Sequence, residues 1–519
     1  MSRELPAKPN LEHLRKQAKD LLRDFERGEP AAIERFRPIS LSASAKPQLA
    51  DAQHIVARDY GFVSWPKLKQ HVEELQNARR PAELLSAAVC ASDADRVARV
   101  LEECPELKSQ LNLPMANYDG MQAMLAAVQR SDRKTIQVLL RAGADIHARS
   151  QSWTPGIGVL DECAEEMAPF LIGCGAVLDA HSAARLAMFD QLQELVKADP
   201  DVVRARGAFG QTPLHFASTV EIAEYLLERG ADIDARDLQH ESTAAQHTLR
   251  VVQARHYHRD RQDIARYLVA QGCQTDIFMA AALGDFALVR RHVDADPDCI
   301  RMRVSEKYFP RQDPHSGGTI YTYQFGPNRT PHQVARDFGH EEILQFLMQH
   351  SPREVKLAQA CELGDEEVFA ELLRERPATG QPLGEEDRRR LPDAAQNNNL
   401  KAVRLMLRAG WPVDARGEYD MTALQWAAWH GNAEMVREIL GHHPRLELDC
   451  EHHITALGSA LHGSMNGWHR DTGNYVATVE VLLHAGAKAP KVTEDLEASY
   501  AVRDVLRRHE QSLPSTPPR

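Results

Sequence analysis

The chain of 519 residues is 43% hydrophobic, 26% charged and 6% aromatic, and its formal net charge is −12. This composition is ordinary for a folded globular protein, and the low aromatic content disfavours an all-β fold. No stretch approaches the roughly 18 apolar residues of a membrane span, so no membrane association is expected.

The first 80 residues differ from the rest in charge. They carry 15 Lys and Arg against 11 Asp and Glu, a net charge of +4, whereas the remaining residues carry 47 against 63, a net charge of −16. Apolar spacing predicts a helix over 11–25, a second over 49–60, and a third that begins after Ser64. We therefore predict a small N-terminal helical module over residues 1–80, closed by the polar stretch 76–81.

Residues 81–490 contain a recurring helix-turn-helix pattern. In the copy that opens with Thr212-Pro213-Leu214-His215, Thr212 can cap the first helix and Gly230 can end the second in a left-handed conformation. Further copies open at Thr330 and Thr422, and Thr422 lies 33 residues before Thr455, which is the ankyrin period. The pattern predicts an all-α, ankyrin-repeat α-solenoid of about eleven or twelve units.

Three insertions interrupt the repeats, near residues 240–260, 301–328 and 464–475. In a solenoid, such insertions are where individual features are placed. After residue 490, we predict a C-terminal capping helix and a disordered tail over residues 491–519.

The second insertion is rich in aromatic residues. Residues 319–325 are β-branched and aromatic, which predicts an exposed strand or hairpin where ankyrin fingers face their partners. Aromatic anchors dominate interface energetics, so this segment is a candidate recognition arm. Its candidate anchors are Tyr308, Phe309, Tyr321 and Tyr323. The alternative is a loop whose aromatic side chains pack on its own base.

Three tryptophans are also of interest. Trp426 and Trp429 lie three residues apart on the first helix of one unit, which lines the concave side of ankyrin arrays. Trp426 occupies a core position and is expected to be buried. Trp429, near the end of that helix, and Trp468, in the third insertion, are further candidates for partner contact.

Histidines crowd the C-terminal repeats, where eight of the 24 fall between His430 and His484. Their spacing matches no ligand motif, and Asp471 is only a loosely placed carboxylate partner. We predict structural or solvent-facing histidines here and no metal site. The same interpretation applies to His247, His256 and His258 in the first insertion.

The sequence contains none of the motifs of serine hydrolases, phosphate-binding loops, dinucleotide-binding folds or zinc proteases. The eight cysteines include no Cys-x-x-Cys pair, so neither a disulfide framework nor a thiolate zinc site is suggested. We therefore predict no enzymatic activity and no cofactor, with the cysteines reduced.

Residues 49–69, with their Tyr60-Gly61-Phe62-Val63-Ser64-Trp65-Pro66 core, resemble the N-terminal segment of many bacterial ankyrin-repeat proteins. The resemblance implies an ankyrin solenoid, an interaction role and a bacterial, cytoplasmic setting; the start of the chain lacks the apolar segment of a signal peptide, which agrees. The chain departs from the repeat consensus, because Gln333 and Gln425 replace the tetrapeptide histidine. At Asn398, Asn stands where other copies have Gly, and Asn is the next best residue for a positive φ.

These observations favour a protein-binding scaffold or adaptor that presents a rigid concave surface. The net charge of −16 favours a basic protein partner and opposes nucleic acid at that surface. Two alternative functions are DNA binding through the N-terminal module, whose residues 60–64 join two helices, and an enzyme of unrecognised design. The module can also be interpreted as a cap over the first repeat. The oligomeric state is not indicated.

Overall fold

The computed structural model describes residues 5, 10–37, 47–115, 120–151, 156–249, 261–374, 385–493 and 496–512. Within these ranges the fold is helical and contains no β-strand; two isolated bridges pair Arg236 with Thr243 and Arg416 with Thr422. No helix there has the length and apolar character needed to cross a bilayer. The chain divides into two compact units, residues 1–199 with 206–209, and residues 200–205 with 210–519.

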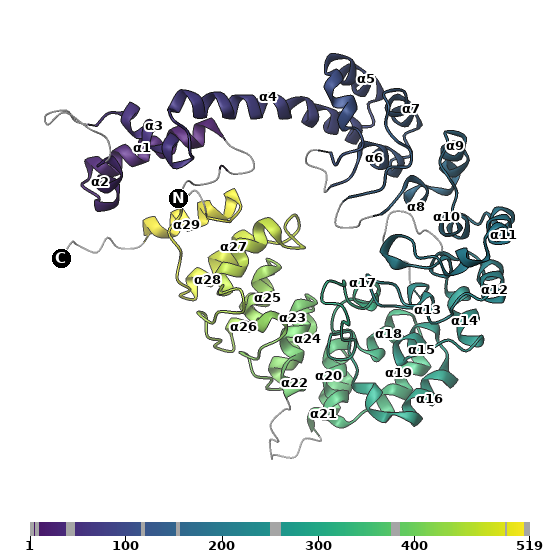
Figure 1. The fold of residues 1–519 in the computed structure, drawn as a ribbon. Helices are drawn as coiled ribbons and strands as arrows, with labels where there is room; N and C mark the ends of the chain where they lie inside the picture. The colour runs from purple at the N-terminus through teal and green to yellow at the C-terminus, as the bar shows by residue number, and fades with distance from the viewer. Residues whose placement is uncertain are drawn as a thin grey trace. The chain divides into compact units, whose positions relative to one another are not determined.

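The N-terminal module of the first unit contains four helices. They are α1 (Leu11–Glu26), α2 (Pro30–Phe36), α3 (Leu49–Asp59) and the first part of α4 (Trp65–Cys90). Helix α2 was not predicted from the sequence. The predicted break at residues 76–81 is wrong, because α4 continues through it as one helix of 26 residues (Figure 1). Its two ends are held in different cores, Leu68 and Val72 in the module and Leu85, Ala88 and Val89 in the first repeat.

The module has a hydrophobic core of its own. Leu14 and Leu21 of α1 are buried against Phe36 of α2 and Ile55 and Val56 of α3. The apolar stripe is therefore covered inside the module, and the role of the module as a cap over the first repeat stays a prediction.

Helix pairs follow the module in the first unit. The pairs are the end of α4 with α5 (Ala94–Glu103), α6 (Ala123–Gln129) with α7 (Arg133–Arg141), α8 (Val159–Glu162) with α9 (Ala168–Gly173), and α10 (Ala180–Arg185) with α11 (Phe189–Ala198). Short 3₁₀ helices lie between them at η1 (Pro105–Gln110) and η2 (Glu165–Met167). Neighbouring pairs pack through small and aliphatic side chains, as stacked repeats require.

The second unit continues with the same kind of pair. Its pairs are η5 (Pro213–Phe216) with α12 (Val220–Glu228), α13 (Ala244–His247) with α14 (Gln262–Ala270), α15 (Ile277–Leu283) with α16 (Phe286–Ala295), α18 (Pro331–Asp337) with α19 (Glu341–His350), α20 (Arg353–Leu363) with α21 (Glu366–Arg374), α23 (Arg390–Gln396) with α24 (Leu400–Arg408), α25 (Ala423–Trp429) with α26 (Ala433–Leu440), and α27 (Ala456–Asn466) with α28 (Tyr475–His484). The connecting helices are η3 (Pro200–Arg204), η6 (Pro297–Arg301), α17 (Tyr321–Gln324), α22 (Glu385–Arg388) and η7 (Glu418–Asp420), with η4 (Ala208–Gly210) at the division between the units. Helix α29 (Tyr500–Ser512) packs on α28.

The local signals of the repeats are confirmed. The backbone φ is +85° at Gly230 and +53° at Asn398, so both residues adopt the predicted left-handed conformation. The Thr330 and Thr422 side chains accept hydrogen bonds from the N–H groups of Gln333 and Gln425, and each glutamine side chain accepts a hydrogen bond from the N–H of its threonine. These reciprocal bonds are capping boxes.

The predicted strand or hairpin at residues 319–325 is wrong. The segment forms the short helix α17, and its backbone bonds are helical, from the Phe325 N–H to the Tyr321 oxygen for example. Tertiary contacts decide the conformation, since the Tyr321 hydroxyl donates to Asp276 and the Gln324 amide donates to the backbone of Gln246. Strand propensity is easily overridden when a segment docks on existing helices.

The other two insertions differ in how much can be described. In the first, His247 ends α13 and its Nε2 lies 3.5 Å from the Asp237 carboxylate, whereas His256 and His258 lie outside the described residues. In the third, α27 extends to Asn466 before the loop that carries Trp468.

Candidate binding surface

The finger between the α23–α24 and α25–α26 repeats presents an aromatic side chain at its tip. The finger is closed by the bridge between Arg416 and Thr422, and Tyr419 within it has a φ of +55°. The Glu451 N–H donates to the Tyr419 carbonyl oxygen, which ties this finger to the next one. Tyr419 is 46% exposed. Non-glycine residues rarely adopt such a φ, so the finger holds this side chain in a strained but defined position.

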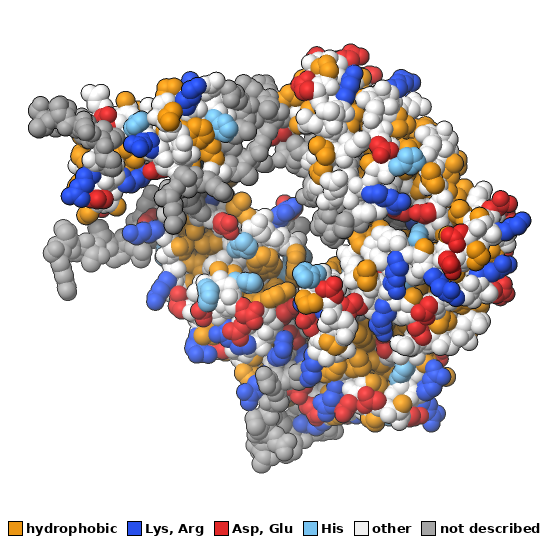
Figure 2. All heavy atoms as spheres, in the orientation of Figure 1, with side chains coloured by type: hydrophobic (Ala, Val, Ile, Leu, Met, Phe, Trp, Pro, Cys, Tyr) orange, Lys and Arg blue, Asp and Glu red, His pale blue; other side chains and the backbone are white. Residues whose placement is uncertain are grey.

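Two indole rings lie beside the finger. The ring of Trp468 stacks on that of Trp426 with centroids 6.1 Å apart and an interplanar angle of 22°, and Tyr419 lies 6.4 Å from Trp426. Trp426 is buried as predicted, whereas Trp468 is 65% exposed. We call Tyr419, Trp426, His430 and Trp468 the aromatic surface. Figure 2 shows hydrophobic and histidine side chains gathered over α25–α28.

His430 forms the inner edge of the aromatic surface. Its Nε2 donates to the Gln396 carbonyl oxygen at 2.8 Å, its ring lies 5.7 Å from Trp468, and its Nδ1 has no partner among the described residues. Burial lowers the pKa of His430 to about 4. The imidazole is therefore neutral near pH 7, and the surface presents rings without a local positive charge.

The aromatic residues predicted in the second insertion are mostly turned inward. Tyr321 is fully buried, so its predicted role as an exposed anchor is wrong. It packs on Phe309 at 5.4 Å and on Phe325 at 5.0 Å. Tyr308 and Phe309 are half-buried, and Tyr323, which is 53% exposed, rests edge-on against His240. The insertion thus packs largely on its own base, which is the alternative that the sequence left open.

The two tryptophans proposed for partner contact also differ in exposure. Trp429 is half-buried, its ring lies 5.4 Å from that of His462, and its backbone oxygen accepts a hydrogen bond from the Tyr475 hydroxyl. Trp468 is the exposed one. Sequence reasoning missed Tyr419, although its place three residues before Thr422 marks it as a finger residue.

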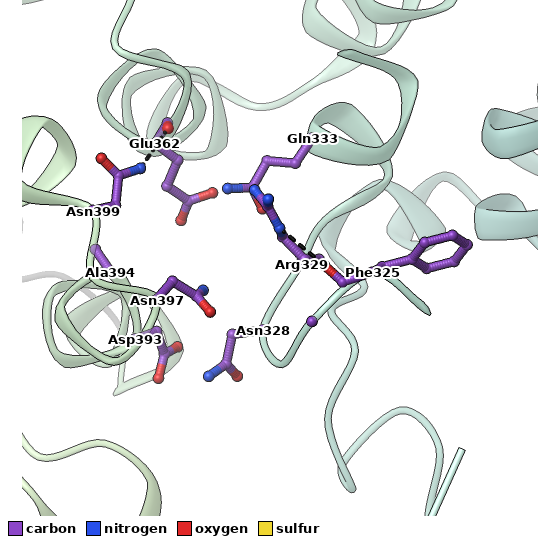
Figure 3. A pocket seen from close by; sticks show the side chains of 10 residues that line it. Phe325, Asn328, Arg329, Gln333, Glu362, Asp393, Ala394, Asn397 and Asn399 are labelled. Atoms are coloured by element: carbon purple, nitrogen blue, oxygen red, sulfur yellow. Dashed lines mark hydrogen bonds between the residues drawn. The ribbon is translucent and has the colours of Figure 1, made fainter. Parts of the chain in front are cut away.

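A polar pocket of about 370 Å³ opens among α18, α20 and α23 and the loop before α18. Figure 3 shows Glu362 and Gln333 reaching toward each other from opposite walls, with Asp393, Asn397 and Asn328 around the lower part. These are first helices of successive repeats, the same side of the units that carries Trp426. The sequence contains no local signal for this pocket, because its walls come from segments far apart in the chain.

Two of the lining residues, Asp393 and Glu362, belong to buried ion pairs. Arg303 lies 2.5 Å from Oδ2 of Asp393, and Arg390 lies 3.2 Å from Oε1 of Glu362. The remaining oxygens, Oδ1 of Asp393 and Oε2 of Glu362, are buried and have no hydrogen-bond partner among the described residues. Burial raises the pKa of Asp393 to about 6, although the Arg303 charge acts in the opposite direction.

The Gln396 side chain connects the pocket to the aromatic surface. It accepts a hydrogen bond from the Asn328 amide at 2.8 Å and donates one to Glu418, the neighbour of Tyr419, at 2.6 Å. The Gln396 backbone oxygen accepts the bond from His430. The two features therefore share one hydrogen-bonded residue.

The clustered histidines do not converge on a metal-like site in the described part of the chain. No group of three or more His, Cys, Asp or Glu side chains there has the geometry to hold a metal ion. His469 lies 5.1 Å from His430, His452 lies 5.7 Å from Tyr419, and His462 lies 2.9 Å from a carboxylate oxygen of Glu497. His469 and His452 thus flank the aromatic surface.

Comparisons with known proteins agree with the repeat assignment. The family described as "Ankyrin repeats (many copies)" matches residues 391–437, and the family "Ankyrin repeat" matches residues 209–238. The ankyrin repeat domain-containing protein SAT10 of Stachybotrys chartarum is 30% identical over 129 residues, which are 25% of this chain and 6% of that protein. This fungal relative gives no support to the bacterial setting implied by residues 49–69.

Among solved structures, the ankyrin repeat domain of Bcl-3, a member of the IkappaB protein family, is similar to this chain. It shares 19% sequence identity over 45% of this chain and 98% of that one, with a TM-score of 0.27. The matched repeat families and the helix pairs carry the assignment. The protein is all-α, and its repeats are those of an ankyrin solenoid.

Proposed function

We propose that this chain is a protein-binding scaffold or adaptor, and that it holds its partner on the aromatic surface of the C-terminal repeats. Ankyrin repeats generally serve as protein interaction modules, and the net charge of −16 beyond residue 80 favours a basic partner. Our proposal also keeps the bacterial cytosol as its setting, from the resemblance of residues 49–69.

One observation carries the proposal. The Trp468 ring is 65% exposed, yet it rests on Trp426 instead of lying free. Because its position is already defined, binding costs little side-chain ordering entropy. Tryptophan is among the residues most enriched at interface hot spots, and Tyr419 extends the same surface. Tyr323 and Trp429 are secondary candidates, the first because it is exposed and the second because it neighbours Trp426.

DNA binding through the N-terminal module has less support. Helices α3 and α4 are joined by a short turn, but Trp65 at the start of α4 packs against the module core instead of projecting from it. That position would have to carry base-reading polar residues in a recognition helix.

The test compares the full chain with a Trp468→Ala variant. Each is immobilised and exposed to extract from the cells that make the protein, and the retained proteins are identified and then titrated singly. Losing one hot-spot tryptophan should weaken the affinity for the partner by about 30-fold, which corresponds to roughly 2 kcal/mol of binding free energy. The matched control is Tyr500→Ala, because Tyr500 is an aromatic side chain that is 90% exposed on α29. Equal affinity for the two variants would contradict the proposal.

A further inference from the structure

The polar pocket is lined by buried atoms that can only accept hydrogen bonds. Asp393 lines the pocket and is 4% exposed; its Oδ1 is buried and has no hydrogen-bond partner among the described residues, while its Oδ2 is bound to Arg303. Glu362 repeats the arrangement, with Oε1 bound to Arg390 and with no hydrogen-bond partner for Oε2 in the described part of the chain. Leaving a buried polar group unsatisfied costs about 1–3 kcal/mol, and more for a charged group. A ligand that fills the pocket should therefore supply donors.

The other residues that line the pocket limit the class of ligand further. Asn328, Asn397 and Gln333 are neutral amides, and the Arg329 guanidinium already pairs with Asp337 and donates to the Phe325 oxygen. An anion would meet the two bare carboxylate oxygens and is disfavoured. The volume of about 370 Å³ admits a planar donor group as well as a smaller ammonium group.

We propose that this pocket binds a guanidinium group, the side chain of an arginine on the protein partner. A guanidinium carries five N–H donors in one plane and can reach two carboxylates at once, and its bonds to them are charge-assisted. This inference rests on the proposed function in so far as the arginine belongs to a bound protein.

The position of the pocket favours an arginine that belongs to a protein. Gln396 joins the pocket to the aromatic surface through Asn328 on one side and through Glu418 and His430 on the other. A single extended segment could thus place an arginine in the pocket and an apolar side chain against Trp468. The acidic charge of the repeats would attract such a basic segment before contact.

The test uses a small probe and the full chain, so that no partner needs to be known. Nα-acetyl-L-arginine amide is titrated by calorimetry beside Nα-acetyl-L-citrulline amide, which has the same shape but carries a neutral urea group. We expect saturable binding of the arginine compound and binding at least tenfold weaker for the citrulline compound. Equal binding of both, or no saturable binding of either, would overturn the proposal and leave a pocket that holds water only.

Two variants locate the binding. Asn397→Leu fills the pocket without removing a member of either ion pair, and Glu362→Gln removes one acceptor charge. Each should weaken the arginine probe at least tenfold. Asn466→Leu, at an exposed position on α27, is the matched control and should bind the probe as the unaltered chain does. Binding that survives Asn397→Leu would place the probe elsewhere and refute the assignment.

Two further measurements distinguish a free amino acid from a partner side chain as the ligand, and the arginine pocket from the proposed function. Free L-arginine should bind no more tightly than the capped probe, whereas tighter binding would identify a free amino acid as the ligand and overturn the assignment to a partner side chain. Trp468→Ala should leave the affinity for the probe unchanged, although it weakens binding of the partner protein. Suppose that Asn397→Leu no longer binds the probe, whereas Trp468→Ala binds the partner as tightly as the unaltered chain does. That result would refute the proposed function and leave the arginine pocket standing.

Discussion

The buried imidazole of His332 should make the repeats sensitive to acid. This side chain on α18 is fully buried, its Nε2 bonds to the Ser351 hydroxyl at 2.9 Å, and that hydroxyl donates to the Leu347 oxygen. Burial, together with the nearby Arg390 charge, lowers the pKa of His332 from 6.5 to about 3. The unfolded chain therefore binds a proton at mildly acid pH that the folded protein cannot accept.

The size of the effect follows from the two pKa values. Stability is lost as pH falls through 6.5 and continues to be lost until the folded histidine also titrates near pH 3. Each pH unit within this window costs about 1.4 kcal/mol, so the loss between pH 7.5 and pH 5 is about 2 kcal/mol. His430, with a pKa of about 4, adds a loss of similar size. Asp393 acts in the opposite direction: its pKa is raised to about 6, so as pH falls the folded protein takes up a proton that the unfolded chain does not, and stability increases by about 1 kcal/mol over the same window.

Comparing variants isolates the contribution of His332. Urea unfolding of the full chain and of His332→Gln is measured at pH 7.5 and pH 5, with hydrogen exchange of α18 and α19 as a local readout, since repeats can open separately. The variant should lose about 2 kcal/mol less than the unaltered chain between the two pH values. His453→Gln, whose side chain is 89% exposed, should change nothing. Losses that agree within about 0.5 kcal/mol for all three proteins would refute the reasoning.

Three further predictions concern packing and accessibility. A Cβ added at Gly463 would lie 2.4 Å from the Trp429 carbonyl oxygen, so Gly463→Ala should destabilise the C-terminal repeats by about 1–3 kcal/mol in urea unfolding; an unchanged midpoint would contradict this close approach. In the native protein, a thiol reagent should modify the half-buried cysteines quickly and the five buried ones only after unfolding, and equal rates would refute the burial pattern. The half-buried cysteines are Cys90, Cys104 and Cys174. Deleting residues 1–72 should shift the melting temperature of the repeats by less than about 2 °C, because the module has its own core; a larger drop would support its role as a cap.

The repeats could be predicted because their signals are local. Thr330 and Thr422 cap helices through residues three positions away, and Gly230 and Asn398 need only their own backbone to adopt a positive φ. Such features are readable from a short window of sequence. The continuous helix α4 was missed because its two ends are held by different cores, and neither core is visible in the polar stretch between them.

The candidate surfaces depend on contacts that no short window contains. Trp426 and Trp468 are in different repeats, and their stacking depends on the course of the loop after α27. The pairing of Arg303 with Asp393 joins residues 90 positions apart. In each case the residue types could be singled out from the sequence, but their partners could not.

The second insertion shows how contacts between distant residues change a functional interpretation made from the sequence. Its aromatic residues suggested a projecting arm, yet Tyr321 is buried and donates to Asp276. What the insertion contributes to the candidate surface comes from its two ends, since Arg303 binds Asp393 and Asn328 binds Gln396. The buried aromatic cluster holds the insertion against the repeats, and its polar ends complete a pocket that the repeats alone would not form. The insertion therefore acts at its base, where it changes the surface of neighbouring repeats, more than at its tip.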